Sequence, residues 1–453
     1  MKKYLPALFI VLSTGTAHAQ SLTQKMDSFM QAANRAQLFN GVVLVARHDS
    51  ILYAKGWGWR DAENKVPHDT NSIFLIGSVT KPFTATLIMD LQERGYLRLT
   101  DRIGKYFPDY KYGNMITIEN LLDHSSGIFE YSKDAEFMSW VTRGHFTEKE
   151  FWERFGEKPL DFTPGTKFGY SNTAYMVLGY LAQKVTGRTY WDLIRQRIFQ
   201  RAGMTHSGFD YIGLSSPFKS VGYDSLYDPD PAQAGIVDST YSFSAGAIYS
   251  TVGDMYRWSQ ALFGGQLISP EDLERSVQIH RVSGSWKYGY GWTMDSAIGK
   301  RLIFHEGGNF GFASLISNIP QDQACIVLLT NNRDRIANAR PCYIGLLQIL
   351  YDQPYVLPRK AIALLPAVLQ EYTGDYELED KKEFKGLIAW KNGQLSISWN
   401  GAKADELYAE KRDLLFLKAY DLQLSFTRDA QGKVTGFTAY SGGKAFVYHK
   451  VGS

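Results

Sequence analysis

The sequence has few cysteines and no arrangement of histidines that is typical of a metal site. Cys325 and Cys342 are its only two cysteines, and neither lies beside a histidine in the sequence. A large core does not need a disulfide, so buried free thiols are favoured over a bridge, although an oxidising compartment would permit one. None of the nine histidines is spaced i, i+2 or i, i+4 from another. The sequence therefore predicts neither a metal site nor a cysteine nucleophile.

Motifs of several other protein classes are also missing. No glycine-rich turn ends in Gly-Lys-Ser or Gly-Lys-Thr, and Gly-x-Ser-x-Gly does not occur, which excludes the common phosphate loop and most α/β-hydrolases. The chain has 49 Lys and Arg residues against 46 Asp and Glu residues, and no block of like charge concentrates the net charge of +3. We therefore expect no cofactor and no nucleic-acid partner.

The N-terminus has the layout of a cleavable secretory signal. Lys2 and Lys3 precede an apolar run over residues 4–11, and small residues follow up to Ala19. We expect residues 1–19 to be removed and the protein to be periplasmic or secreted. An uncleaved membrane anchor is the alternative, but the run is far shorter than the ~20 residues that span a bilayer, and no other stretch is long enough. No membrane span is therefore expected after removal of the signal.

The 453-residue chain divides into two blocks by its pattern. Residues 20–353 mix helical and strand signals. Residues 366–453 read as short strands separated by turns, for example at Asn392-Gly393 and Gly442-Gly443. Prolines interrupt the segment between the blocks, residues 354–365, which suits a linker. We therefore expect a larger mixed domain followed by a small all-β domain.

The first block has strand signals near both ends and helical signals between them. Strands are expected at 41–45, 51–53, 302–304, 313–317 and 324–330, and helices from Gly77 to Gly95, from Thr173 to Gly187 and at 344–350. Such an order implies one antiparallel sheet whose halves come from opposite ends of the block, flanked by helices. The predicted fold class is therefore α/β, of the α+β type.

The pattern Ser-x-x-Lys places a hydroxyl and an amine on one face of a helix, and it occurs three times. It begins at Ser78, Ser216 and Ser441, so the pattern alone is weak. Only Ser78 follows an apolar strand-like run and opens a long amphipathic helix, whose N-terminus offers free backbone N–H groups and a positive dipole end. Ser78 and Lys81 are therefore the candidate nucleophile pair. The alternative is an N-cap serine with a solvated lysine.

Two further short motifs contain residues that can do chemistry. Tyr170-Ser171-Asn172 lies just before the second expected helix. His305-Glu306-Gly307-Gly308 lies on an expected strand, whose two-residue period aims His305 and Gly307 the same way. Each motif on its own is compatible with a structural role, because a lone histidine or tyrosine is commonly part of the packing.

Taken in order, Ser78-x-x-Lys81, Tyr170-x-Asn172 and His305-x-Gly307 resemble the three-motif signature of the serine β-lactamase and penicillin-binding-protein superfamily. The similarity covers about residues 21–353 and is to the branch of class C β-lactamases, D-alanyl-D-alanine carboxypeptidases, D-aminopeptidases and related esterases. It implies a β-lactamase/transpeptidase-like fold, in which an antiparallel sheet flanked by helices carries a helical subdomain. Residues 366–453 resemble the lipocalin-like β-barrel that some members carry.

The resemblance implies an acyl-enzyme mechanism. Ser78 would be the nucleophile, with Lys81 and Tyr170 as its catalytic partners. Free lysine and tyrosine titrate near 10, so a base at neutral pH needs roughly 4 kcal/mol of help from its surroundings. The two groups would share one proton, and the sequence does not say which of them holds it. His124 lies in another segment that resembles the family and is interpreted as structural, because a polar turn needs such groups to satisfy its backbone.

The resemblance also implies which groups hold the substrate. Asn172, His305 and Gly307 are expected to contact it, and the backbone N–H groups of Ser78 and Gly308 to form an oxyanion hole. Class C β-lactamases usually carry Lys-Thr-Gly at the third motif, so the histidine in this chain puts recognition of a substrate carboxylate in doubt. If His305 faces the cleft, its cation would assist a carboxylate only below its ordinary pKa near 6.5.

These inferences predict an exported serine hydrolase that acts on small peptide, amide or ester substrates, with D-amino-acid peptides as the first choice. A broad esterase or a weak β-lactamase is the alternative among enzymes. A penicillin-binding sensor or pseudoenzyme, in which deacylation is blocked, stays open, as does a binding or assembly role of the C-terminal barrel. The same domain is where a homo-oligomer would form.

Overall fold

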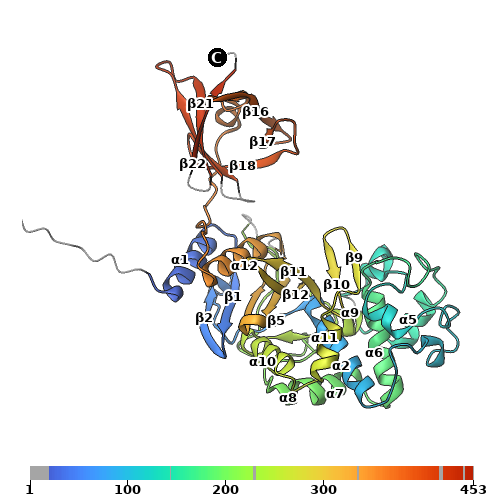
Figure 1. Ribbon diagram of the computed structural model, residues 1–453. Helices are drawn as coiled ribbons and strands as arrows, with labels where there is room; N and C mark the ends of the chain where they lie inside the picture. The colour runs from blue at the N-terminus through green and yellow to red at the C-terminus, as the bar shows by residue number, and fades with distance from the viewer. Residues whose placement is uncertain are drawn as a thin grey trace, which may run out of the picture.

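The structure, a computed structural model, describes residues 20–142, 144–227, 231–333, 336–417, 422–441 and 444–451. The predicted signal segment, residues 1–19, and the predicted turn at Gly442-Gly443 lie outside the described residues. The chain forms a large α/β part and a C-terminal β-barrel (Figure 1). In the part of the chain that is described, no helix is both long enough and apolar enough to cross a membrane.

An eight-stranded antiparallel sheet forms the centre of the large part, in the order β2-β1-β14-β13-β12-β11-β10-β9. Its strands are β1 (Gly41–Arg47), β2 (Ser50–Trp57), β9 (Arg281–Ser283), β10 (Trp286–Tyr288), β11 (Thr293–Ala297), β12 (Lys300–Asn309), β13 (Phe312–Ile319) and β14 (Ala324–Thr330). β1 pairs with β14, so that Gly41 lies opposite Thr330 and Arg47 opposite Ala324. The predicted antiparallel sheet, built from both ends of the block, is confirmed.

Successive residues of β1 enter different apolar clusters on the two faces of the sheet. Val43 packs into the cluster that includes α1 (Leu22–Arg35) and α12 (Ile336–Leu350), whereas Val42 and Leu44 pack into the larger cluster on the other face. Figure 1 shows α1 and α12 beside each other next to the sheet. The nearly continuous apolar run of β1 reflects this burial on both faces.

The two cysteines are buried free thiols, as expected. Cys325 on β14 belongs to the larger apolar cluster, whereas Cys342 on α12 belongs to the cluster on the opposite face. Burial raises the pKa of each thiol to about 12, so neither is a thiolate at neutral pH.

Helices cover the second face of the sheet and extend into a helical region (Figure 1). They are α2 (Thr80–Glu93), α3 (Ile118–Leu122), α4 (Ala135–Met138), α5 (Glu148–Phe155), α6 (Asn172–Thr186), α7 (Tyr190–Ile194), α8 (Gln200–Ala202), α9 (Ser239–Gly246), α10 (Val252–Phe263) and α11 (Pro270–Ser276). The 3-10 helices are η1 (Gly77–Val79), η2 (Ile103–Lys105), η3 (Tyr131–Lys133) and η5 (Pro320–Asp322), and η4 (Arg195–Phe199) is a π-helix. Short strand pairs are β3 (Trp59–Asp61) with β4 (Val66–Pro67), β5 (Phe74–Leu75) with β8 (Tyr249–Ser250), and β6 (Tyr223–Ser225) with β7 (Ala232–Gln233).

The two helices predicted in the middle of the block are α2 and α6. Gly187 ends α6 in a left-handed conformation, with φ 67°, as the predicted glycine stop requires. The helix expected at 344–350 is the second half of α12, which begins at Ile336. Pro341 lies inside α12 and interrupts the local helical pattern, which explains why the sequence indicates only the later part.

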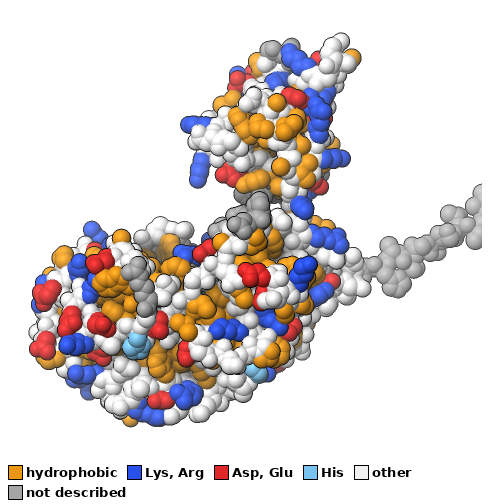
Figure 2. Space-filling model, turned by 180° about the vertical axis from the view of Figure 1, so that it is seen from behind, with side chains coloured by type: hydrophobic (Ala, Val, Ile, Leu, Met, Phe, Trp, Pro, Cys, Tyr) orange, Lys and Arg blue, Asp and Glu red, His pale blue; other side chains and the backbone are white. Residues whose placement is uncertain are grey.

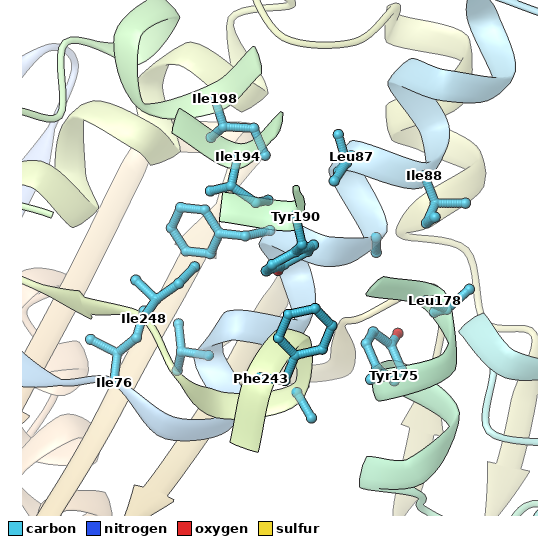
Figure 3. Close-up of a cluster of buried hydrophobic side chains, with 14 of the residues drawn as sticks. Ile76, Leu87, Ile88, Tyr175, Leu178, Tyr190, Ile194, Ile198, Phe243 and Ile248 are labelled. Atoms are coloured by element: carbon cyan, nitrogen blue, oxygen red, sulfur yellow. The ribbon is translucent and has the colours of Figure 1, made fainter. Parts of the chain in front are cut away.

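α2 lies in the middle of the large apolar cluster. Leu87 on α2, Tyr175 on α6 and Tyr190 on α7 converge there, with Phe243 of α9 between them (Figure 3). These side chains are almost completely buried. A helix that is buried on all sides is held rigidly by its neighbours. The residues at its N-terminus, including Ser78, are therefore fixed in position.

Eight antiparallel strands close into the C-terminal barrel, which confirms the expected β-barrel. They are β15 (Gly374–Leu378), β16 (Lys381–Lys391), β17 (Gln394–Trp399), β18 (Asp405–Lys411), β19 (Leu414–Leu417), β20 (Gln423–Arg428), β21 (Val434–Ser441) and β22 (Lys444–Lys450). A short helix, α13 (Pro366–Gln370), precedes them where an all-β pattern was expected. Pro366 at its first turn has the backbone angle that a helix start needs.

The second half of the segment between the two parts, residues 354–365, contacts the barrel. Ile362 donates its N–H to the carbonyl of Ala409 at 2.8 Å, and Arg359 Nε lies 3.4 Å from Glu410 Oε2. Among the described residues, no apolar cluster has members in both parts. Figure 2 shows the barrel as a separate lobe on a narrow neck.

Candidate active site

Two glycines allow the turn that carries Ser78 to pack directly against β12. Gly77 has φ 51°, and a Cβ at this residue would lie 2.5 Å from the carbonyl oxygen of Gly308. A Cβ at Gly307 would lie 2.1 Å from the carbonyl oxygen of Ile76. Only glycine permits such an approach. It brings Gly308 beside Ser78, where both line one cavity, as an oxyanion hole made of their N–H groups requires.

Lys81 is completely buried on α2, one helical turn after Ser78. Its Nζ lies 3.0 Å from Ser78 Oγ, 2.7 Å from Asn172 Oδ1 and 2.9 Å from the carbonyl oxygen of Ala245. Burial lowers the pKa of Lys81 from 10.5 to about 7, although the negative charge of Glu130 opposes this. In the neutral amine, two N–H groups satisfy Asn172 and Ala245, and the lone pair faces the Ser78 hydroxyl.

Tyr170 lies just before α6 and is partly buried. Its ring centroid is 4.8 Å from Lys81 Nζ. Burial raises the pKa of Tyr170 well above 10, while a hydrogen bond to Ser78 opposes the rise and the charge of Glu130 adds to it. The phenol is therefore protonated at neutral pH. Of the two residues that the sequence left undecided, Lys81 has the pKa that suits a base.

Glu130 is a buried acid that the sequence analysis missed. Its carboxylate accepts the backbone N–H of Asn172 at 2.6 Å, the Asn172 side-chain amide at 2.8 Å and the backbone N–H of Thr173 at 3.3 Å. It thus caps the N-terminus of α6, where free N–H groups attract negative charge. Glu130 fixes the Asn172 amide so that its oxygen faces Lys81. Because 42 residues separate Glu130 from Asn172, no local pattern reveals the pair.

His305 lies in the site but supplies no positive charge there. It is buried on β12, and its Nδ1 donates to the carbonyl of Glu306 at 2.6 Å, which leaves Nε2 to accept from the Tyr288 hydroxyl at 3.0 Å. Burial, aided by the charge of Lys81, lowers the pKa of His305 from 6.5 to about 3. The expectation that His305 offers a cation to a substrate near pH 6 is therefore wrong.

His124 packs among aromatic rings beneath Tyr170. Its ring centroid lies 4.3 Å from that of Tyr170, 5.1 Å from Tyr175 and 4.7 Å from Tyr288. Its Nδ1 accepts the backbone N–H of Ser171 at 3.1 Å. Burial lowers the pKa of His124 well below 6.5, so the ring is neutral. These contacts support the Tyr170 loop, in agreement with the structural interpretation.

Neither of the other two Ser-x-x-Lys matches ends in a buried lysine. Lys219 Nζ, which follows Ser216, donates to the carbonyl of Ile212 at 3.1 Å and is not buried. The match that begins at Ser441 includes residues 442–443, which lie outside the described residues. Of the three candidates, Ser78 is the one that the structure joins to a buried lysine.

Ser78 lies between two cavities. The first, of about 220 Å³, is lined by Asn172 and Gly308, and the second, of about 190 Å³, by Tyr170 and His305. Ser78 lines both cavities, so a substrate attached to it would extend into each. The structure thus places every predicted catalytic side chain around one serine.

The second cavity also contains two residues that the sequence analysis did not identify. Trp286 projects from the β9–β10 hairpin, with its ring centroid 6.0 Å from that of Tyr170. Arg340 on α12 is the only lysine or arginine among the described residues that line this cavity, which Asp295 and Glu306 also line. Both come from segments far from the motifs in sequence, so only the tertiary structure places them in the site.

Comparisons with known proteins find relatives of this chain. A family model described as Beta-lactamase matches residues 22–350. Penicillin-binding protein 4* of Bacillus subtilis is 27% identical over 430 residues, which cover 90% of this chain and 94% of the relative. An octameric penicillin-binding protein homologue from Pyrococcus abyssi has a TM-score of 0.66 and 21% identity, covering 94% of this chain and 99% of that one.

A second solved structure matches a smaller share of the chain. The D-amino acid amidase from Ochrobactrum anthropi SV3 has a TM-score of 0.64 and 22% identity, and the match covers 74% of this chain and 99% of that one. At these identities the solved structures bear on the fold, which is β-lactamase-like with an added barrel.

Proposed function

The chain belongs to the Beta-lactamase family, and on that premise we propose that it uses Ser78 to form an acyl-enzyme with small amide, peptide or ester substrates. D-amino-acid peptides and amides are the first choice of substrate. One observation carries the proposal: Lys81 Nζ lies 3.0 Å from Ser78 Oγ. Burial lowers the pKa of that amine to about 7, so it can act as a base at neutral pH.

Acylation begins when neutral Lys81 accepts the proton of Ser78 Oγ. The serine oxygen then bonds to the carbonyl carbon of the substrate, and the carbonyl oxygen becomes an oxyanion. The backbone N–H groups of Ser78 and Gly308 donate to that oxyanion. One such donor typically contributes roughly 10²–10³-fold to kcat.

Collapse of this intermediate expels the leaving group and requires a proton. The Tyr170 hydroxyl, which is protonated and hydrogen-bonded to Ser78, donates to the leaving nitrogen or oxygen as its bond to carbon breaks. The proton held by Lys81 then restores the phenol. Water next attacks the acyl-enzyme by the same route, releases the acid and regenerates the Ser78 hydroxyl.

The cavities support small substrates. Their volumes, about 220 and 190 Å³, are below the roughly 300–1,000 Å³ of sites for drug-sized ligands. Arg340 gives the second cavity a guanidinium that can pair with a free carboxylate, such as that of a terminal amino acid. The name of the amidase supports D-amino acid amides, and that of the relative supports a penicillin, as the first compounds to test.

Covalent labelling tests the nucleophile. Ser78→Ala should abolish labelling by a serine-directed phosphonate and leave thermal unfolding nearly unchanged, because it removes a single oxygen atom from a residue that lines two cavities. Ser216→Ala, in another Ser-x-x-Lys match, should label like the unmodified protein. Full labelling of the Ser78→Ala protein, or a label mapped to another serine, would refute the assignment.

Intact-protein mass spectrometry tests the substrate class. The protein would be mixed separately with a penicillin, a peptide ending in D-Ala-D-Ala, a D-amino acid amide and a simple ester. An adduct that forms and decays within minutes supports a hydrolase, whereas one that persists for hours supports a penicillin-binding sensor. No adduct and no product with any of the four would contradict the proposed chemistry.

Export and assembly are further parts of the proposal. The pattern of residues 1–19 supports export, and the mature protein is then expected to begin at Gln20. The homologue described as octameric supports testing for a homo-oligomer. Mass measurement of the N-terminus and light scattering of the full chain check the two points.

A further inference from the structure

Tyr170 identifies which cavity receives the acyl group. In the proposed mechanism Tyr170 protonates the leaving atom. The leaving group must therefore lie on the same side of Ser78 as Tyr170. Tyr170 lines the second cavity, whereas Asn172 and Gly308 line the first. The first cavity is therefore the one that receives the acyl group, and it is called the acyl cavity below.

The acyl cavity has an apolar wall and one charged side chain. The larger apolar and aromatic residues of this wall are Tyr131, Met138, Val141, Val237, Tyr241 and Phe310, and uncharged polar residues such as Ser132, Ser242 and Asn309 also line the cavity. Arg333 is the only charged residue among the described residues that line it, and none of these is acidic. Burial against this wall stabilises an apolar acyl chain of a substrate, whereas a polar group of that substrate needs a hydrogen-bonding or charged partner there. Arg333 is a partner for a negative group.

The position of Arg333 is supported by neighbours on two sides. Its guanidinium lies 5.1 Å from the centroid of the Phe310 ring, a contact that favours a cation. Two residues earlier, Asn331 is completely buried and donates from Nδ2 to the carbonyl of Val221 at 2.7 Å. The backbone that follows β14 is thus anchored at Asn331, whereas the Arg333 side chain is exposed at the cavity.

We propose that the acyl cavity selects acyl groups that are apolar along their length and end in a carboxylate, which Arg333 binds. The proposal rests on the proposed function, because an acyl group reaches this cavity only if Ser78 is acylated. A guanidinium offers two parallel N–H groups to a carboxylate, a geometry that a simple point charge does not provide. The substrate class is therefore amides, peptides or esters of short dicarboxylic acids, including acidic acyl residues.

Two matched esters test this selection. The 4-nitrophenyl esters of valeric acid and of glutaric acid share their leaving group and chain length, and differ in a terminal methyl against a terminal carboxylate. Any effect of the second cavity cancels in the ratio of their kcat/KM values. This glutaryl-to-valeryl ratio would be measured for the unmodified protein, Arg333→Gln, Arg333→Lys and Arg195→Gln.

The unmodified protein should prefer the glutaryl ester, and Arg333→Gln should lower the ratio by about five-fold, a size suited to a solvent-exposed charge pair. Arg333→Lys should retain part of the preference, because it keeps the charge but loses the bidentate geometry. Arg195, an exposed arginine paired with Asp192, is the control and should leave the ratio unchanged. About 0.5 M salt should weaken the preference, since screening acts on exposed charges.

The outcomes separate this inference from the proposed function. Turnover of both esters with a ratio that Arg333→Gln does not change would overturn the role of Arg333 and leave the acyl-enzyme mechanism standing. A preference for the valeryl ester in the unmodified protein would do the same. Failure to turn over either ester, together with no labelling of Ser78, would instead overturn the proposed function.

Discussion

Burial of the Lys81 amine sets the pH at which the site can work. Only the neutral amine accepts the Ser78 proton, and an amine is protonated below its pKa. With the pKa of Lys81 lowered to about 7, kcat/KM for an uncharged ester should rise from about pH 5, pass its midpoint near pH 7 and level off by about pH 9. An amine with the ordinary pKa of 10.5 would give no plateau in this range. A flat profile would show that Lys81 is not the base.

Glu130 should influence both the geometry and the pH profile of the site. Glu130→Gln removes a negative charge that raises the pKa of Lys81, so the acidic limb of kcat/KM should move to lower pH. The same change weakens the hold on Asn172, and kcat/KM at its plateau should fall by about ten-fold. Glu130→Asp keeps the charge and should leave the limb in place.

The control for Glu130 is an exposed glutamate. Glu157 pairs with Lys111 on the surface of the helical region, so Glu157→Gln should change neither the limb nor the plateau. A purely structural Glu130 would lower the unfolding temperature without moving the limb. That result would contradict its electrostatic role toward Lys81.

At the scale of elements, α9 lies so close to α6 that only glycine fits between them. A Cβ at Gly179 would lie 2.1 Å from Ser244 Oγ and 2.6 Å from Ser244 Cβ. Ser244 Oγ in turn donates to the carbonyl of Tyr175 at 2.8 Å. Inside α9, Phe243 has a strained backbone, with φ 35° and ψ −129°, and two residues later the Ala245 carbonyl accepts from Lys81. The α6–α9 contact therefore supports the site.

Gly179→Ala should destabilise the protein by about 1–3 kcal/mol, because the added methyl group overpacks the contact between the helices. Chemical denaturation measures this cost. The same change on an open helix surface is the control. A Cβ at Gly253 in α10 would lie 3.8 Å from its nearest neighbour, so Gly253→Ala should be neutral or stabilising by up to ~1 kcal/mol. Equal stability of the two variants would contradict the packing argument.

Local patterns predict elements well where one helix or strand carries its own signals. The apolar period and the glycine stop locate α6, and the apolar run of β1 indicates a strand. They fail at α13, whose five residues are too few to show a helical period. The start of α12 is missed for a similar reason, since a proline interrupts the pattern.

For the whole molecule, the separate apolar clusters predict that the large part folds without the barrel. The apolar cluster of the barrel comprises residues within 364–448 alone. The described residues that line either of the two site cavities all precede residue 341. A chain ending at Leu357 keeps Tyr355, whose ring centroid lies 6.2 Å from that of Phe29 on α1. It should unfold in one transition and retain kcat/KM for simple esters within about three-fold.

Calorimetry and ester kinetics on the shortened chain check this expectation, with the full chain as the control. An insoluble or molten fragment would show that the two parts form one cooperative unit. A folded fragment with altered ester preference would show that the barrel influences the site over a distance.

The amino-acid sequence by itself determined the order of the motifs, the two-block division and the candidate residues Ser78, Lys81, Tyr170 and Asn172. It could do so because the helix start at Ser78 and the glycine stops are local signals, and because the order of the three short motifs resembles that of a known family. Only the tertiary structure decided the charge states in the site. The pKa values of Lys81 and His305 depend on burial by segments far away in sequence.

The tertiary structure also decided which further groups surround Ser78. Arg333 and Arg340 line the two cavities beside it, and Glu130 holds the Asn172 amide, whose oxygen accepts from Lys81. Their roles follow from distance and from loss of water, and neither quantity is encoded in the spacing of residues along the chain.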